Sequence, residues 1–191
     1  GHCNSCIDVI ELEKKYKIIG LIDKKAKIRN QKYKILGSDN DLKIFLSKTN
    51  LAHITLGQIK NLDKREKIFN NLKKIGFKLP RIISPLAYVS PFAKIGEGTI
   101  VMHGAIVNRG AVIGNNTIIN TKALVEHDAN VGNNCHLATR STINGGCHLG
   151  NNSFIGSHAV IQQNIKIGKN CFVNANLFIN KDMENNSKIY E

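Results

Sequence analysis

The chain has 191 residues, of which 42% are hydrophobic and 6% aromatic, and it carries a formal net charge of +13. This length suits one large or two small globular domains, and no apolar run reaches the roughly 18 residues that a membrane span requires. The lysines are mixed with acidic residues and no Trp is present, so the charge favours anionic small ligands such as nucleotides or coenzyme A over nucleic acid.

The first fifteen residues, "GHCNSCIDVIELEKK", are too polar for a secretory signal, so we expect a cytoplasmic protein. Five cysteines, an odd number, then favour reduced thiols. Cys3 and Cys6 form a lone C-x-x-C without a second pair, which is weak evidence for a metal or redox site. We expect Cys6 to face the core of a helix.

Residues 1–80 alternate helical and strand patterns. "NSCIDVIELEKK" predicts a helix after an Asn4/Ser5 cap, and "KIIGLID" predicts a buried strand. "DLKIFLSK" predicts a short helix, "LAHITLG" a second buried strand, and "KREKIFNNLKKIG" a helix that ends at Gly76. Strands that alternate with helices indicate an α/β domain with a small parallel sheet.

A six-residue repeat replaces this alternation from Ile83 onward. Every sixth residue from Val89 to Ile179 is Val, Ile or Leu, and most residues four places after each of these are small. A helix of about 3.6 residues per turn cannot keep a six-residue apolar period on one face, whereas a solenoid of short parallel strands can. The pattern therefore predicts an all-β parallel β-helix over residues 81–191, with the branched side chains stacked inward.

A second period of eighteen residues lies on top of the first and is marked by Gly96, Gly114, Gly132, Gly150 and Gly168. Three hexads therefore make one coil, and the cross-section is expected to be a triangular prism. We expect the glycine and asparagine residues to occupy corners that need a positive φ. The cysteines of this part fall on small-residue positions and are expected to be inert packing residues.

Four short segments carry a resemblance to a known family. They are "GH" at the first helix, "GLIDKK" at the end of the "KIIGLID" strand, "TLGQ" at the end of the "LAHITLG" strand and "INTKALVEHD" in the middle of the prism. Together with the hexads they resemble the left-handed β-helix acyltransferases of the hexapeptide-repeat family. The most similar branch contains bacterial sialic acid O-acetyltransferases and the N-acetyltransferases of bacillosamine and related amino sugars.

The resemblance implies two domains. Residues 1–80 would form a small Rossmann-like α/β domain that binds a nucleotide sugar, without the first strand that the family places before "GH". Residues 81–191 would form the left-handed β-helix acyltransferase domain, which ends before the C-terminal segment usual in the family. The implied assembly is a homotrimer with sites between adjacent prisms.

The resemblance also implies the activity and the site residues: an acetyl-CoA-dependent acetyl transfer to a sugar, without a metal. By position, His127 matches the family's general base and Asp128 the acidic residue that orients it. The positions implied for substrate binding are Asn120, His2, Asp23 and Lys24. The positions implied for acetyl-CoA binding are His136, Gly145 and, in "VNANLF", Ala175.

The chemistry of the "EHD" segment agrees with this assignment. An amine or hydroxyl that attacks a thioester must lose a proton, and a histidine held by a carboxylate is suited to accept it. By sequence alone, either Glu126 or Asp128 can hold His127, and the resemblance favours Asp128. One coil after His127 lies Gly145, at a strand spacing of about 5 Å, where it leaves room for a thioester carbonyl and offers an N–H to the oxyanion.

Two further positions follow from the eighteen-residue coil. Arg109 lies one coil before His127, where it can meet a carboxylate or phosphate. His136 lies half a coil after His127, so the two histidines are expected on opposite sides of one prism. If both serve one site, that site is built from two protomers.

Three functions compete at this stage. The leading prediction is N-acetylation of a nucleotide-activated amino sugar in bacterial surface-glycan biosynthesis, because the N-terminal domain suits a nucleotide. The first alternative is O-acetylation of sialic acid or a related nonulosonate, since one histidine–carboxylate pair serves amines and hydroxyls alike. The second alternative is a non-catalytic trimeric scaffold, because a fold does not imply a function. The spacings between the prism's histidines are not whole coils, so no metal site is predicted.

Overall fold

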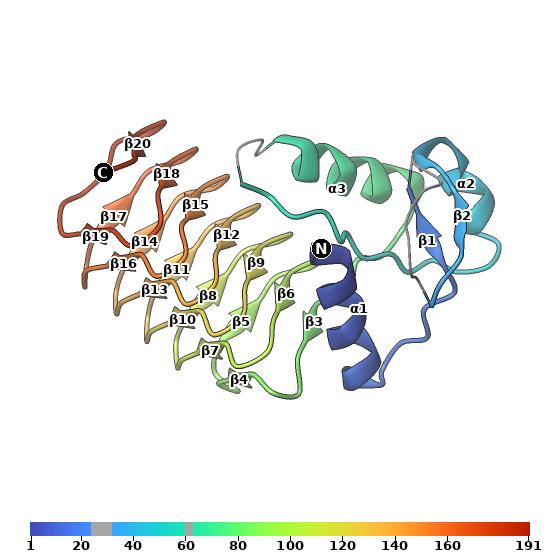
Figure 1. The fold of residues 1–191 in the computed structure, drawn as a ribbon, viewed down its shortest axis with the longest axis horizontal. Coiled ribbons are helices and arrows are strands. Elements are labelled where there is room, and N and C mark those ends of the chain that lie inside the picture. The colour runs from blue at the N-terminus through green and yellow to red at the C-terminus, as the bar shows by residue number, and fades with distance from the viewer. Residues whose placement is uncertain (24–31, 60–62) are drawn as a thin grey trace.

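The computed structural model describes residues 1–23, 32–59 and 63–191. The chain has two parts, a front domain made of the elements before strand β3 and a prism of stacked β-coils that extends away from it (Figure 1). The prism is a left-handed parallel β-helix, which confirms the predicted fold class.

The front domain contains short helices and one small sheet. Its elements are α1 (His2–Glu13), β1 (Leu21–Ile22), β2 (Ile35–Gly37), the 3₁₀ helix η1 (Asp39–Asp41), α2 (Leu42–Phe45) and α3 (Asp63–Ile75). Strands β1 and β2 pair in parallel, which agrees with the predicted small parallel sheet, although β2 was not among the strands that the sequence predicted. Gly76 follows α3 with a φ of +114°, and Cys6 lies on the buried side of α1 and is fully buried. Both agree with the predictions made for these residues.

Two local predictions for this domain are wrong. Helix α1 begins at His2 with Gly1 as its N-cap, not after Asn4/Ser5, because the Asn4 N–H already bonds the Gly1 carbonyl at 3.0 Å. The segment "LAHITLG" forms no strand and has only an isolated parallel bridge between Leu51 and Lys78. Further along this segment, backbone carbonyls accept hydrogen bonds from an arginine side chain in place of a neighbouring strand.

The prism consists of three parallel sheets of two-residue strands. One sheet contains β3 (Ile82–Ile83), β6 (Ile100–Val101), β9 (Ile118–Ile119), β12 (His136–Leu137), β15 (Phe154–Ile155), β18 (Phe172–Val173) and β20 (Lys188–Ile189). The second contains β4 (Tyr88–Val89), β7 (Ile106–Val107), β10 (Leu124–Val125), β13 (Thr142–Ile143), β16 (Val160–Ile161) and β19 (Phe178–Ile179). The third contains β5 (Lys94–Ile95), β8 (Val112–Ile113), β11 (Asn130–Val131), β14 (His148–Leu149) and β17 (Lys166–Ile167).

The core of the prism follows the hexad pattern. Every sixth residue from Val101 to Ile179 is buried, and the two earlier positions, Val89 and Ile95, are partly buried against the same cluster. Neighbouring strands from β3 to β19 are offset by eighteen residues, so that Val125 lies beside Val107 and Ile143, and the offset shortens to sixteen where β18 pairs with β20. The repeat therefore fixes which residues stack, coil upon coil.

The corners correct one prediction. The glycines that recur every eighteen residues do not have a positive φ, which falls two residues later, at Gly98 and Asn116 for example. The recurring glycines instead permit close approach of the coils, since a Cβ on Gly114 would lie 2.6 Å from the Gly132 carbonyl carbon. Asparagine tolerates the positive φ, so the "GNN" segments combine a close contact with a left-handed corner.

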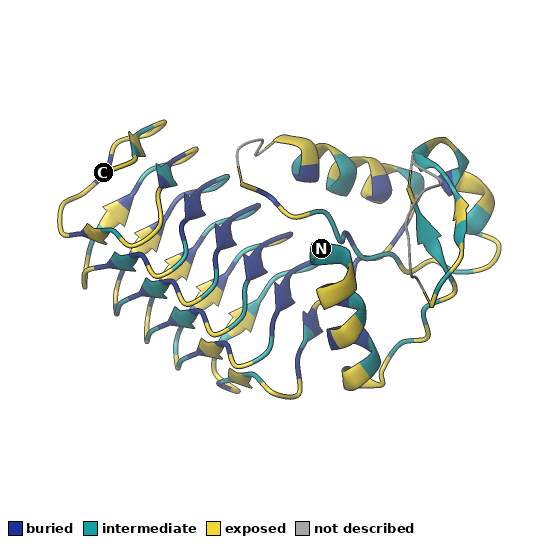
Figure 2. Cartoon of the chain, viewed as in Figure 1, coloured by how far each residue is buried: buried dark blue, intermediate teal, exposed yellow. Residues whose placement is uncertain are grey.

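The three faces of the prism differ in their outward side chains, which are the first residues of the strands. The face of β3 to β20, here called the covered face, is packed against the front domain in its first coils, and its strands β6, β9, β12 and β15 are dark blue in Figure 2. The face of β4 to β19, here called the apolar face, presents Tyr88, Ile106, Leu124, Thr142, Val160 and Phe178. The face of β5 to β17, here called the polar face, presents Lys94, Val112, Asn130, His148 and Lys166.

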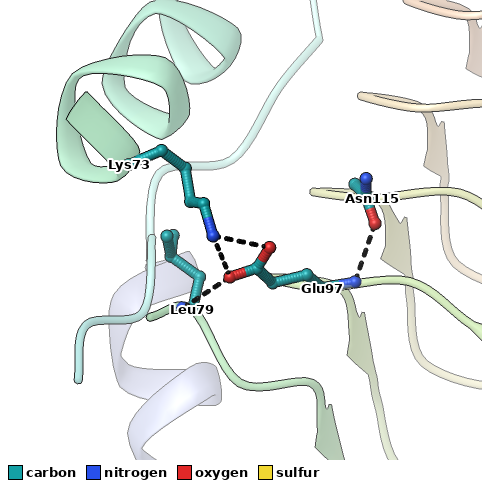
Figure 3. Close-up of polar contacts among 4 residues, drawn as sticks. All are labelled: Lys73, Leu79, Glu97 and Asn115. Atoms are coloured by element: carbon teal, nitrogen blue, oxygen red, sulfur yellow. Dashed lines mark hydrogen bonds and ion pairs between the residues drawn. The ribbon is translucent and has the colours of Figure 1, made fainter. Parts of the chain in front are cut away.

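Helix α3 is tied to the first coils of the prism by an ion pair. Lys73 reaches both carboxylate oxygens of Glu97, at 2.7 and 2.9 Å (Figure 3). Glu97 also accepts the N–H of Leu79 and donates its own N–H to the side chain of Asn115. One surface residue of the prism thus holds α3, the connecting segment and the next coil.

Candidate active site

His127 lies at the corner between β10 and β11, on the side where the apolar and polar faces meet. Its side chain is 59% exposed, and its Nδ1 is 2.9 Å from Oδ2 of Asp128. A ring nitrogen beside a carboxylate carries the hydrogen, so Nδ1–H donates to Asp128 and Nε2 is left with its lone pair.

Asp128 is held at the corner by its backbone. Its φ is +59°, a conformation that aspartate tolerates better than most residues, and its N–H donates to the Arg109 carbonyl at 3.1 Å. Gly110 lies one coil before it, and a Cβ there would be 2.3 Å from Asp128 Oδ1. Gly110 is thus required for the carboxylate to lie where it does. We did not predict it, although the same eighteen-residue shift that identified Gly145 leads from Asp128 to Gly110.

Gly145 lies against the other edge of the His127 ring, as the coil period predicts. A Cβ on Gly145 would be 2.7 Å from both Cε1 and Nε2 of His127. The neighbouring Gly146 donates its N–H to the His127 carbonyl at 3.1 Å and so sets the spacing of the two coils. In the described parts of the chain, the Gly145 N–H has no hydrogen-bond acceptor. The free edge of the histidine and a free backbone donor therefore lie side by side.

The second acidic candidate, Glu126, does not contact the imidazole ring. Its Oε2 accepts a hydrogen bond from Asn108 Nδ2 at 2.8 Å and one from the backbone N–H of His127 at 3.3 Å. Of the two carboxylates that the sequence left open, Asp128 is the one beside the ring.

His136 lies on β12 of the covered face, in a separate cluster. It is 5% exposed, and its Nδ1 hydrogen-bonds the backbone carbonyl of Gln58 in the front domain. Its Nε2 is 3.2 Å from Asn120 Nδ2, and Oδ1 of Asn120 accepts the N–H of Thr121 at 2.8 Å. Burial lowers the pKa of His136 to about 4, so the ring is neutral near pH 7.

His2 completes this cluster from the first turn of α1. Its ring centroid is 6.4 Å from that of His136, and its Nε2 is 3.5 Å from the thiol of Cys6. Burial, followed by the charge of Arg65, lowers the pKa of His2 to about 4. A cavity of about 480 Å³ opens here, lined by His2, Leu56, Gly57, Ile59, Lys64, Asn120 and His136.

The remaining predicted residues lie at different distances from these two clusters. Asp23 follows β1, donates its N–H to the Gly37 carbonyl and lines a front-domain cavity of about 700 Å³ that also reaches His2. Lys24 lies outside the described residues. Ala175 is exposed on the corner between β18 and β19, three coils beyond the corner of Asn120.

The structure thus places the predicted site residues in two separate clusters of one chain. His127, Asp128 and Gly145 gather at one edge of the apolar face, while Asn120 and His136 lie at its other edge, with β10 between them. Arg109, expected near an anion, stacks its guanidinium 3.6 Å from the ring centre of Phe92.

Metal ligands, membrane-spanning helices and the prism cysteines were considered over the described residues. Within residues 1–23, 32–59 and 63–191, no three His, Cys, Asp or Glu side chains are grouped as metal ligands would be. No helix in these ranges combines the length and the apolar character needed to cross a membrane. The three prism cysteines are buried, and burial raises the pKa of Cys135 to about 12.

Family models match both parts of the chain. Residues 1–72 match the PglD N-terminal domain, and residues 146–181 match the bacterial transferase hexapeptide (six repeats). No curated protein sequence matches the chain.

Solved structures match nearly the whole chain. One is a His-to-Asn variant of perosamine N-acetyltransferase from Caulobacter crescentus in complex with CoA and GDP-perosamine; it is 27% identical, covers 98% of this chain and 88% of that chain, and has a TM-score of 0.93. Another is the acetyltransferase domain of PglB from Neisseria gonorrhoeae in complex with acetyl coenzyme A, with 27% identity, coverage of 98% and 90%, and a TM-score of 0.90. WeeI from Acinetobacter baumannii, 21% identical with coverage of 100% and 92%, shares the fold with a TM-score of 0.87.

Proposed function

Because the chain is a hexapeptide-repeat acetyltransferase of the left-handed β-helix class, we propose that it transfers the acetyl group of acetyl-CoA to the amine of a nucleotide-linked amino sugar. The observation that carries this proposal is the arrangement of His127, Asp128 and Gly145. It supplies a proton acceptor, a carboxylate that fixes its tautomer, and a neighbour without a side chain beside its second ring nitrogen.

In the proposed reaction, Nε2 of His127 takes a proton from the amine as the amine nitrogen bonds to the thioester carbonyl carbon. Asp128 accepts a hydrogen bond from the Nδ1–H group and stabilises the imidazolium that forms. The carbon–sulfur bond then breaks, and the proton passes from His127 to the departing thiolate. One proton and one acetyl group are exchanged, so no further reactant is needed.

The carbonyl oxygen of the thioester gains negative charge during the attack. The Gly145 N–H lies beside the His127 ring and has no acceptor among the described residues, which supports a role in binding this oxygen. A side chain at position 145 would fill the same space. Both properties of glycine, a free donor and no Cβ, therefore serve the same step.

An amine on a nucleotide-linked sugar is the acceptor that the comparisons favour. The structural relative from Caulobacter crescentus is an N-acetyltransferase in complex with a GDP-linked sugar, and the N-terminal domain matched by a family model is present here. Asp23 and His2 line the front-domain cavity of about 700 Å³, which supports their assignment to substrate binding. The net charge of +13 suits a diphosphate and coenzyme A.

We also propose that the working unit is a homotrimer. The apolar face exposes Tyr88, Ile106 and Phe178 at 57%, 40% and 61%, which is unusual for a face of a monomer. Its two edges carry the two clusters of predicted site residues. Packing this face between neighbouring copies in a closed ring would bring His127 of one copy toward Asn120 and His136 of another. The predicted cytoplasmic location remains a prediction.

Isotopically labelled acetyl-CoA tests the activity. We expect transfer of label to at least one nucleotide-linked amino sugar in a panel that also contains free amino sugars and sialic acids. Transfer only to a sialic acid hydroxyl would contradict the amine assignment. A panel without any transfer would contradict acetyltransferase activity on these sugars and favour the scaffold.

Mixed trimers test the shared site. His127→Asn and His136→Asn chains are each expected to be inactive alone. When the two are co-expressed in equal amounts, about a quarter of the sites combine two intact halves, so about a quarter of the activity should return. Co-expression of each variant with itself is the control. Recovery no greater than in the control would contradict a site between protomers.

A further inference from the structure

Arg65 is a buried arginine at the junction of the two parts of the chain. It belongs to α3, is 1% exposed, and donates to four backbone carbonyls. Two of them lie in the front domain, Ile54 and Leu56, each at 2.8 Å. The other two lie in the prism, Asn116 at 3.1 Å and Gly98 at 3.5 Å. One guanidinium therefore spans both parts with hydrogen bonds of fixed direction.

This contact differs from the ion pair that α3 also makes to the prism. Lys73 is exposed and paired with the carboxylate of Glu97, a kind of contact that contributes little. Among the described residues, Arg65 contacts only carbonyls and no carboxylate. A buried charge without a counter-ion is costly, and the four directed hydrogen bonds compensate for the burial of this guanidinium.

The segment that Arg65 holds contacts His136 at its far end. Ile54 and Leu56 are followed by Gln58, whose carbonyl accepts the Nδ1–H of His136. The side chain of Gln58 donates to the Asn134 carbonyl at 2.6 Å and is almost fully buried. The extended segment is thus held by Arg65 at one end and by Asn134 at the other, and its last carbonyl is aimed at the His136 ring.

These contacts permit one protonation state of His136. With Nδ1–H bonded to a carbonyl, Nε2 must accept a hydrogen from the amide of Asn120. The amide cannot turn over, because its oxygen already accepts the N–H of Thr121. A second proton on His136 would face an N–H group. The ring is therefore a fixed acceptor, and the other amide hydrogen of Asn120 is directed by it toward the cavity that both residues line.

We propose that Arg65 is a positioning residue of the acetyl-transfer site, which acts by fixing residues 54–58 so that Gln58 holds His136 in its neutral Nδ1–H form and thereby orients Asn120. This inference rests on the proposed function. Arg65 itself makes no hydrogen bond to any predicted site residue that the structure describes. Its effect passes through the backbone of the segment.

The charges around His136 favour the same state. Burial lowers the pKa of His136 to about 4, and the nearby His2 and Arg65 lower it, against the raising effect of the Gln58 carbonyl. Among the described residues, the charged or titratable groups that line this cavity or shift the pKa of His136 are His2 on α1 and Lys64 and Arg65 on α3. None of them is an acid that would stabilise a protonated ring.

Nitrogen NMR of the His136 ring, recorded without substrate, tests the proposal in the full chain. Arg65→Lys keeps a positive charge but loses the planar set of donors, so it separates charge from direction. We expect the single Nδ1–H signal of the wild type to become a mixture of tautomers. We expect kcat for acetyl transfer to fall about 10-fold while both KM values change less than about threefold.

Lys73→Met is the matched control, because it removes the ion pair between α3 and Glu97 of the prism and leaves Arg65 in place. It should keep both the His136 signal and kcat. If Arg65→Lys also keeps a single Nδ1–H form and wild-type kcat, the proposal is wrong. Because the NMR signal needs no turnover, it tests Arg65 even if no sugar proves to be a substrate.

A second variant covers the case in which Arg65→Lys does not fold. Gln58→Asn shortens the side chain that anchors the far end of the segment and leaves Arg65 intact. We expect the same mixture of His136 tautomers in this variant. An unchanged His136 signal there would overturn the proposal.

Discussion

His127 and His136 belong to the same prism, nine residues apart, but their rings face opposite kinds of groups. His127 is exposed at a corner, with a carboxylate on one nitrogen and Gly145, which has no side chain, beside the other. His136 is buried, with a carbonyl on one nitrogen and an amide donor on the other. The first environment suits the proton transfer proposed for His127, whereas burial keeps the ring of His136 neutral.

This difference shows that the repeat does not decide what a histidine does. Both residues occupy outward positions that the hexads leave free. The neighbouring chemistry then makes one of them suited to accept a proton from a substrate and the other suited to hold a fixed hydrogen bond. Substitution of either histidine, or of the groups that surround it, should therefore change this difference in a measurable way.

Removal of the exposed histidine should have the largest effect. His127→Asn deletes the proposed proton acceptor, so kcat for acetyl transfer should fall about 10³-fold. Because the side chain is 59% exposed, the midpoint of thermal unfolding should move by less than about 2 °C. Steady-state kinetics and calorimetry measure the two effects. A variant that retains more than about a tenth of wild-type kcat would exclude His127 as the general base.

The buried histidine should instead appear in the pH dependence of stability. Its pKa is lowered by burial from 6.5 to about 4, so above pH 6.5 the ring is neutral in both states and contributes nothing. Below pH 6.5 the unfolded chain binds a proton that the folded chain refuses. The unfolding free energy should therefore fall between pH 6.5 and 4, by about 3 kcal/mol for this residue.

Denaturant unfolding at several pH values measures this slope. His2 and His53, whose pKa values burial lowers to about 4 and about 3, add to the decline in the same direction. His136→Gln should reduce the slope. Equal slopes in the wild type and the His136 variant would contradict the environment described for this ring.

The two carboxylates beside His127 should differ in effect. Asp128→Asn keeps a residue that tolerates the positive φ but removes the charge next to Nδ1, so kcat should fall about 10- to 100-fold. Glu126→Gln keeps an acceptor for Asn108 and for the backbone, and kcat should change less than about threefold. Kinetics of both variants decide the assignment, and a larger loss in the Glu126 variant would reverse it.

The space beside His127 can be closed with a single methyl group. In Gly145→Ala the new Cβ would lie 2.7 Å from the ring, so the ring must move, and kcat should fall about 10-fold. The φ of Gly145 is not positive, so the backbone itself accepts alanine. Gln163→Ala, at the exposed position one coil further along the same corner, is the control and should keep wild-type kcat. An active Gly145→Ala enzyme would show that the thioester does not need this space.

The sequence predicted the prism and the geometry within the repeat. The six-residue period identified the inward residues, and the eighteen-residue period brought Gly145 beside His127. The same eighteen-residue shift leads from Asp128 to Gly110, a contact that the sequence analysis did not predict. These predictions succeed because each coil repeats the last, so distance along the chain converts directly into distance in space.

The front domain was less predictable. The segment "LAHITLG" has the composition of a buried strand, but its carbonyls at Ile54 and Leu56 accept hydrogen bonds from Arg65 in place of a strand partner. Nothing in the pattern of α3 shows that its one arginine is buried across a domain junction. A short apolar run does not show which partner its backbone will have.

The sequence by itself therefore determined the β-helix, its register and the contents of the His127 corner, because a periodic chain repeats the same local geometry in every coil. Only the tertiary structure decided which carboxylate contacts His127 and what surrounds His136. The first depends on the φ of one corner residue and on the glycine beneath it. The second depends on Gln58, 78 residues away in the sequence, and contacts between non-repeating segments have no period from which to predict them.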